Sequence, residues 1–92
     1  MNLSEIDDSF DFEWDCWKWM PETMECRIVC EEGIIILMVD GESLEGLVSI
    51  EMKDDFHHEE SWHGTFNSLT EAKNWCMDKA KSLAQGFRGE DS

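Results

Sequence analysis

The sequence predicts a single α+β domain, in which a small antiparallel sheet of four to five strands packs against one C-terminal helix over about residues 68–85. Two observations lead to this prediction. Between residues 10 and 62, apolar and polar residues alternate in short runs separated by turn-forming residues, which is typical of half-buried strands. After residue 68, apolar residues recur every three or four positions, as in an amphipathic helix. Consecutive strands followed by one covering helix define the α+β class.

The domain limits follow from composition. A chain of 92 residues with 41% hydrophobic residues forms one globular domain. We expect an acidic N-terminal arm (residues 1–9), the domain itself (10–86) and a frayed C-terminal tail (87–92). The N-terminus has neither the basic region nor the apolar run of a signal peptide, and no apolar run is long enough to cross a membrane. We therefore expect a cytoplasmic protein with reduced thiols at Cys16, Cys26, Cys30 and Cys76.

The first predicted strand covers residues 10–15, where aromatic and acidic residues alternate strictly. Its core face would carry Phe10, Phe12 and Trp14, and its solvent face Asp11, Glu13 and Asp15. The alternation then slips by one residue. A β-bulge near Asp15–Cys16 would return Trp17 and Trp19 to the core.

Four further segments read as strands. Residues 23–31 and 47–53 alternate, with Cys26, Ile28, Val48 and Ile50 among the inward positions. The unbroken apolar run over residues 34–39 predicts a central strand covered on both faces, and residues 56–62 predict a short last strand. Turns are expected at Glu32–Gly33, Asp40–Gly41 and Asp54–Asp55.

The helix has clear start and stop signals. Ser68 and Glu71 have the spacing of a capping box, and Gly86 suits the residue just past the helix end. The helical spacing assigns one core-facing side to Leu69, Ala72, Trp75, Cys76, Ala80 and Leu83.

The negative charge is confined to the first two thirds of the chain. Residues 1–60 hold 18 acidic and three basic residues, which accounts for the whole net charge of −15, whereas residues 61–92 hold four of each. Such an excess repels itself and lowers the stability of the compact state. It therefore serves either solubility or the attraction of a basic partner.

No catalytic or metal site stands out. Cys26 and Cys30 would lie roughly 13 Å apart on a strand, and adjacent His57 and His58 would point to opposite faces, so neither pair can chelate one ion. Acidic surroundings raise a thiol pKa and so disfavour a cysteine nucleophile. No carboxylate pair is distinguished among the 22 acids. We expect no enzyme activity and no cofactor.

The charge also excludes two classes of ligand. Phosphate contacts need a basic patch, so we expect no direct nucleic-acid binding, and the acidic surface argues against anionic membranes. Most tryptophans fit core positions, and Trp62, beside Gly64, is the one expected to be exposed.

The acids themselves are the candidate site. Alternate residues on a strand lie roughly 6.5–7 Å apart on one face, on the order of the spacing between neighbouring phosphates. Rows of this kind could occupy a basic groove built for DNA or RNA. We therefore assign partner binding to Asp11, Glu13, Asp15, Glu25, Glu31, Glu42, Glu45, Glu51, Asp54, Asp55 and Trp62.

In charge, size and compactness the chain resembles, as a class, the small acidic phage proteins that mimic DNA, which include anti-restriction proteins, anti-CRISPR proteins and uracil-DNA glycosylase inhibitors. The resemblance implies a non-enzymatic inhibitor of a basic, nucleic-acid-binding host protein. The alternative is an acidic adaptor that binds a host factor through an exposed apolar patch such as Trp62 or Phe56. A small metal sensor or enzyme is a third hypothesis, and a homodimer formed through the apolar 34–39 strand is a further expectation to test.

Overall fold

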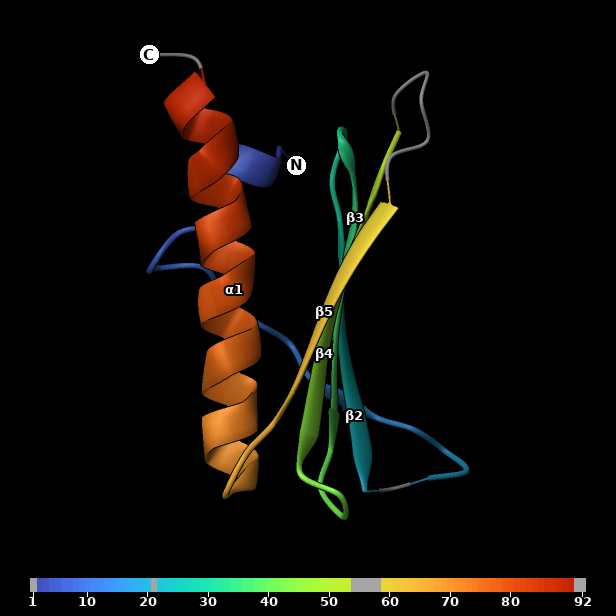
Figure 1. Ribbon diagram of the computed structural model, residues 1–92. Coiled ribbons are helices and arrows are strands. Elements are labelled where there is room, and N and C mark those ends of the chain that lie inside the picture. Colours follow the sequence, from blue (N-terminus) through green and yellow to red (C-terminus); the bar gives the residue numbers. More distant parts are fainter. Residues whose placement is uncertain (1, 21, 54–58, 91–92) are drawn as a thin grey trace.

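The computed structural model describes residues 2–20, 22–53 and 59–90, with the last five of these described by their helical backbone alone. The elements, in chain order, are η1 (Leu3–Glu5), β1 (Asp15–Cys16), β2 (Thr23–Val29), β3 (Gly33–Asp40), β4 (Glu45–Met52), β5 (Glu59–Thr65) and α1 (Leu69–Glu90). The strands keep this order in one sheet, and each pairs antiparallel with its neighbours. The predicted α+β class is therefore confirmed: one five-stranded antiparallel sheet packs against one C-terminal helix (Figure 1).

The core lies between α1 and one face of the sheet. Leu37, in the middle of β3, stands directly opposite Cys26 on β2 and Val48 on β4. Because residues opposite one another share a face, the alternation within each strand produces one continuous apolar layer. This layer confirms the predicted inward positions of β2 and β4, and it consists of Cys26, Ile28, Ile35, Leu37, Val39, Val48 and Ile50.

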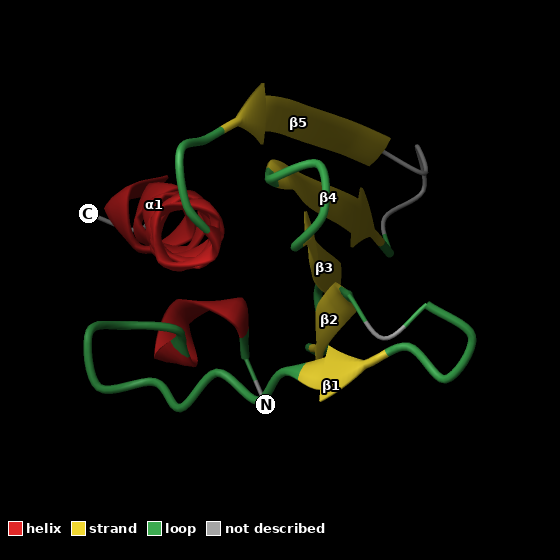
Figure 2. Ribbon diagram, turned by 90° about the horizontal axis from the view of Figure 1, so that it is seen from below, coloured by secondary structure: helices red, strands yellow, loops and turns green. Residues whose placement is uncertain are grey.

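β3 is the central strand, as predicted, but it is not covered on both faces. Its core-facing side chains are fully buried, whereas those on the opposite face are only partly buried (Ile34, Ile36 and Met38). Figure 2 shows α1 and η1 on the same side of the sheet, and in the described part of the chain no second layer lies on the other side. The unbroken apolar run therefore supplies a core face and an uncovered apolar face. With β3 in the centre, the expected dimer contact through an exposed edge at 34–39 is wrong.

Residues 10–14 keep the predicted alternation without forming the predicted strand. Phe10, Phe12 and Trp14 pack against the core, while Asp11 and Glu13 are exposed. Only β1, two residues long, pairs with β2 in this part of the chain. The segment thus closes one side of the core with aromatic side chains.

The predicted return of Trp17 and Trp19 to the core is wrong. Trp17 is 37% exposed and Trp19 is 86% exposed. The backbone N–H of Trp17 donates to the carbonyl of Thr23, and the Thr23 N–H donates to the carbonyl of Met20, so the chain turns back tightly on itself here. This loop projects from the β1 edge beyond the uncovered side of the sheet instead of adding a bulged strand (Figure 2).

The N-terminal segment, which was expected to be an acidic arm, contributes two residues to the core. Leu3 is 1% exposed and Ile6 is fully buried, and η1 packs against α1. The Leu3 N–H donates a 2.9 Å hydrogen bond to Glu32 Oε1 in the turn between β2 and β3. The segment expected to be an arm is thereby attached to the sheet and to the helix.

α1 begins as predicted. Ser68 Oγ accepts a 3.1 Å hydrogen bond from the Glu71 N–H, and Glu71 Oε2 accepts a 3.3 Å bond from the Asn67 N–H. The helix continues through Gly86 to Glu90, so the predicted stop at Gly86 is wrong. A glycine inside a helix costs about 1 kcal/mol relative to alanine, which a long helix tolerates. No helix in the described ranges has the length and apolarity needed to cross a membrane.

Small residues let α1 approach the sheet closely. Among the helix residues whose side chains are described (69–85), four are fully buried, are spaced four apart and are small: Ala72, Cys76, Ala80 and Ala84. On the sheet, Cys76 meets Gly46, where an added Cβ would lie 3.2 Å from Cys76 Sγ and 3.1 Å from the ring of Phe66. At the two sides of this contact, Lys73 lies over the Trp14 ring and Lys79 over the Trp62 ring.

Candidate functional site

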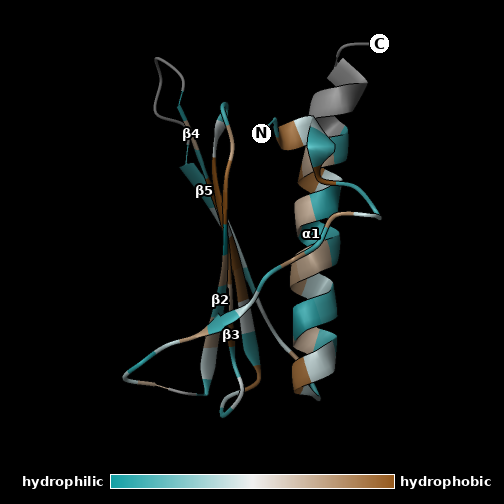
Figure 3. Cartoon of the chain, turned by 180° about the vertical axis from the view of Figure 1, so that it is seen from behind, coloured by the Kyte–Doolittle hydropathy of each residue, from teal (hydrophilic) through white to brown (hydrophobic). Residues whose placement is uncertain are grey.

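The uncovered face of the sheet is the candidate site, and its centre is apolar. We call it the open face. Val29 is 55% exposed, and a partly buried row continues from it across the middle strands, where hydrophobic colouring dominates in Figure 3. The members of this apolar centre are Val29, Ile34, Ile36, Met38 and Leu47. Such a contiguous uncovered apolar area typically marks a site of interaction.

Three pairs of carboxylates surround the apolar centre. Across the strands, Asp15 stands opposite Glu25, Asp40 opposite Glu45, and Glu51 opposite Glu59, all on the open face. Directly opposed residues in an antiparallel sheet are close neighbours, with Cα atoms roughly 4.5–5.5 Å apart. Like charges in such positions destabilise a sheet. We refer to these residues as the three carboxylate pairs.

Glu25 is the best-supported member of these pairs. Its Oε2 accepts a 2.9 Å hydrogen bond from the indole Nε1–H of Trp17, and its Oε1 contacts Arg27 Nη2 at 3.3 Å. These two donors offset part of the repulsion from Asp15, and they hold Trp17 against the open face. Glu45 also has a side-chain partner, because its Oε2 lies 3.5 Å from Nε2 of His63.

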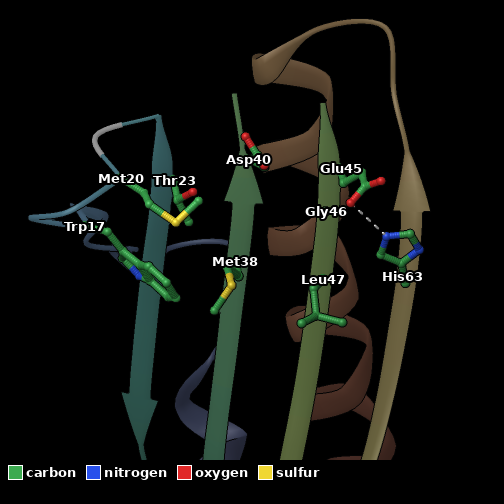
Figure 4. Close-up of a pocket in the computed structure, with 9 residues that line it drawn as sticks. All are labelled: Trp17, Met20, Thr23, Met38, Asp40, Glu45, Gly46, Leu47 and His63. Carbon is green, nitrogen blue, oxygen red and sulfur yellow. Dashed lines mark ion pairs between the residues drawn. The ribbon is translucent and has the colours of Figure 1, made fainter. Parts of the chain in front are cut away.

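A pocket of about 250 Å³ opens on this face, next to the Asp40–Glu45 pair (Figure 4). Met38 and Leu47 form its floor, since they lie side by side on β3 and β4. Trp17 stands at one side and His63 at the other. The remaining lining residues are Met20, Thr23, Asp40, Glu45 and Gly46.

The backbone fixes the charge of one carboxylate at this pocket. The N–H groups of Glu42 and Ser43 donate to Asp40 Oδ1 at 2.9 and 3.4 Å in the predicted Asp40–Gly41 turn. The bond from Glu42 in particular lowers the pKa of Asp40 below its ordinary value. Asp40 is therefore ionised at neutral pH.

The structure brings some of the predicted site residues together and separates others. Asp15, Glu25, Glu45 and Glu51 lie on the open face. Asp11 and Glu13 lie along the outer edge of β2, beside Arg27 and Val29. Two of the predicted acids, Asp15 and Glu25, therefore oppose each other, whereas Glu45 and Glu51 oppose the acids Asp40 and Glu59, which were not predicted. The others lie in turns (Glu31, Glu42) or outside the described residues (Asp54, Asp55).

Trp62 differs from its expected exposure. It is partly buried on the helix-facing side of β5, opposite Val48, with Lys79 Nζ 4.4 Å from its ring centroid. Trp17, Met20, Asp40, Glu59 and His63 belong to the open face, although sequence reasoning did not include them. The slip in alternation before Pro21 was the available signal, because a loop that leaves the sheet there exposes Trp17.

Three of the four cysteines are buried. All four are free, and only Cys16 is exposed. Burial raises the pKa of Cys26 and of Cys76 to about 11, and burial also raises that of Cys30. Within residues 2–20, 22–53 and 59–90, no group of three or more His, Cys, Asp or Glu side chains is arranged to hold a metal ion. His57 and His58 lie outside the described residues.

Comparison with known proteins gives no significant match: no family model, no curated protein and no solved structure is similar to this chain. The class that the geometry defines is an α+β domain with a helix on one face of its sheet and an acidic-rimmed apolar surface on the other.

Proposed function

We propose that this protein is a non-enzymatic acidic inhibitor, which binds a basic, nucleic-acid-binding host protein through the open face and competes with DNA or RNA for it. The observation behind the proposal is the presence of the three carboxylate pairs around the apolar centre. Opposed like charges destabilise a sheet unless donors offset them, as Trp17 and Arg27 do at Glu25 and backbone N–H groups do at Asp40. A charge arrangement that costs stability is accounted for by a partner that neutralises it.

A role in solubility alone accounts for this arrangement less well. Solubility depends on net charge, which acids at widely separated positions provide equally well. Here six of the acids are opposed across strands and flank the uncovered apolar face. A binding groove for nucleic acid is basic, so the open face would meet it with complementary charge and fast, steered association.

The apolar centre favours a second candidate, an acidic adaptor that binds its partner mainly by apolar contact. Val29, Ile34 and Met38 would then carry most of the affinity, and the acids would only keep the protein soluble. Salt separates the two functions. Electrostatic binding weakens steeply as ions shorten the field to about 8 Å, whereas apolar binding does not.

The test is capture from a bacterial host lysate at low and high salt, followed by release with a DNA or RNA duplex. We expect captured proteins that themselves bind nucleic acid, that duplex releases, and that high salt removes. The Glu51→Gln/Glu59→Gln variant should capture less. Its matched control is Asp8→Asn/Asp78→Asn, which removes the same charge from exposed positions away from the open face and also removes the exposed ion pair between Asp8 and Lys81.

Three results would count against the proposal: capture that persists in high salt, no release by nucleic acid, or equal losses in the two variants. Salt-resistant capture that Met38→Lys abolishes would establish the adaptor function instead. Circular dichroism of each variant checks that the domain is folded.

A further inference from the structure

The pocket beside the Asp40–Glu45 pair combines three features that rarely coincide by chance. Its floor is apolar, one side is the indole of Trp17, and two carboxylates, Asp40 and Glu45, line it at the hairpin end of β3 and β4. A purely apolar ligand would bring no positive charge to Asp40 or to Glu45, of which Glu45 already contacts His63 Nε2 at 3.5 Å. A small inorganic cation would make no use of Met38 and Leu47.

The shape of the pocket suits a long side chain with a charged end. Met38 and Leu47 lie side by side on adjacent strands and offer an apolar track for a methylene stem. The track leads toward Asp40 and Glu45, which stand opposite one another at the hairpin end. A volume of about 250 Å³ holds one large side chain and not a peptide segment.

Trp17 is held in position before any ligand arrives. Its Nε1–H is bonded to Glu25 at 2.9 Å, so the indole is fixed while 37% of the residue stays exposed. An exposed, immobilised indole face is a good surface for a planar cation, because guanidinium groups stack on aromatic rings and also bind carboxylates in a bidentate manner. An ammonium group on a lysine uses only the charge.

We propose that this pocket receives an arginine side chain of the partner, with its stem over Met38 and Leu47, its guanidinium against Trp17, and its charge neutralised by Asp40 and Glu45. The inference rests on the proposed function and adds a specific contact to it. Arginines that contact phosphates are abundant in nucleic-acid-binding proteins. An arginine held in this pocket could not at the same time contact a phosphate of DNA or RNA.

The test uses three short peptides and the full chain. The probes are acetyl-Gly-Arg-Gly-amide and the same peptide with citrulline or norleucine in place of arginine. Citrulline keeps the planar end group without its charge, and norleucine keeps only the stem. Binding is followed by NMR through the indole N–H of Trp17 and the backbone amides of Leu47 and His63.

We expect the arginine peptide to shift these signals and to bind roughly tenfold more tightly than citrulline, a difference of about 1.4 kcal/mol. Trp17→Ala and Glu45→Gln should each weaken it several-fold. Their matched controls are Trp19→Ala, an exposed tryptophan outside the pocket, and Asp78→Asn, an exposed acid on α1. Glu45→Gln keeps the test valid if Trp17→Ala fails to fold.

Equal binding of the citrulline peptide would overturn the arginine assignment. NMR shifts spread over the whole acidic surface, and unchanged in the Trp17→Ala and Glu45→Gln variants, would overturn it as well. The peptide experiment and the lysate experiment can refute their two proposals separately. Peptide binding without nucleic-acid competition in the lysate overturns the inhibitor function alone, and competition without peptide binding overturns the pocket alone.

Discussion

The indole Nε1–H of Trp17 donates to Glu25 Oε2 at 2.9 Å, and this bond connects the loop after β1 to the open face of the sheet. It explains why a tryptophan outside the core has a defined position. Trp19, two residues further on, is 86% exposed, and its ring contacts only Lys18 among the aromatic interactions of the described residues. The two tryptophans therefore form a natural comparison.

Replacing Trp17 by phenylalanine should lower the free energy of unfolding by roughly 1 kcal/mol, the usual net value of one hydrogen bond. Trp19→Phe is the control, and it should leave stability unchanged. Urea denaturation followed by circular dichroism measures both. Equal values for the two variants would mean that the Trp17–Glu25 bond contributes nothing to stability.

Neutralising one member of a carboxylate pair should stabilise the domain. Glu59→Gln removes the repulsion from Glu51, and the expected gain is roughly 0.2–1 kcal/mol. Asp78→Asn, which removes one charge from the exposed side of α1, should have a smaller effect. The gain should shrink in high salt. A loss of stability in Glu59→Gln would show that the pair is satisfied within the protein.

A methyl group at Gly46 should separate the helix from the sheet. Its Cβ would lie 3.1 Å from Phe66 and 3.2 Å from Cys76 Sγ, so we expect Gly46→Ala to cost about 1–3 kcal/mol. Combining it with Cys76→Ala makes room on the helix side. The double variant should therefore lose less stability than the two single variants together, and strict additivity would contradict this packing.

Stability should fall in alkaline solution because of the buried thiols. Burial raises the pKa of Cys26 and Cys76 from 9.0 to about 11, so between these values the unfolded chain releases protons that the folded chain keeps. Unfolding is thus favoured as pH rises through this range, by at most roughly 2–3 kcal/mol per thiol.

Urea denaturation at pH 8 and pH 10.5 measures this effect. Cys76→Ala should flatten the pH dependence, while the same change at exposed Cys16 should not. An identical slope in both variants would assign the alkaline loss to other groups.

The sequence was sufficient to predict the elements in which local pattern and tertiary contact agree. The alternation of β2 and β4 and the Ser68–Glu71 cap reappear in the structure, since each is decided by nearby residues. The unbroken run in β3 was ambiguous, because an apolar side chain looks the same whether or not another layer covers it. Burial of Leu3 depends on a contact with Glu32, 29 residues away, which no local pattern encodes.

The candidate site was predictable in its charge and not in its geometry. Sequence reasoning names four acids of the open face (Asp15, Glu25, Glu45 and Glu51) and omits Asp40 and Glu59. The pairing depends on register, which places Glu51 opposite Glu59 and Asp40 opposite Glu45. The pocket was not predictable, because Trp17 reaches it from a loop. The alternation of apolar and polar residues predicted a continued strand there. The backbone hydrogen bonds among Trp17, Met20 and Thr23 instead form a tight loop.

The row of small residues along α1 limits which insertions and deletions the sequence can accept during evolution. Ala72, Cys76, Ala80 and Ala84 meet the sheet only because they are spaced four apart. One inserted or deleted residue within the row would turn everything beyond it by about 100°. Larger side chains would then be driven against the sheet. Substitutions on the outer side of the helix can accumulate freely, whereas changes in length are expected in the turns at either end of the sheet.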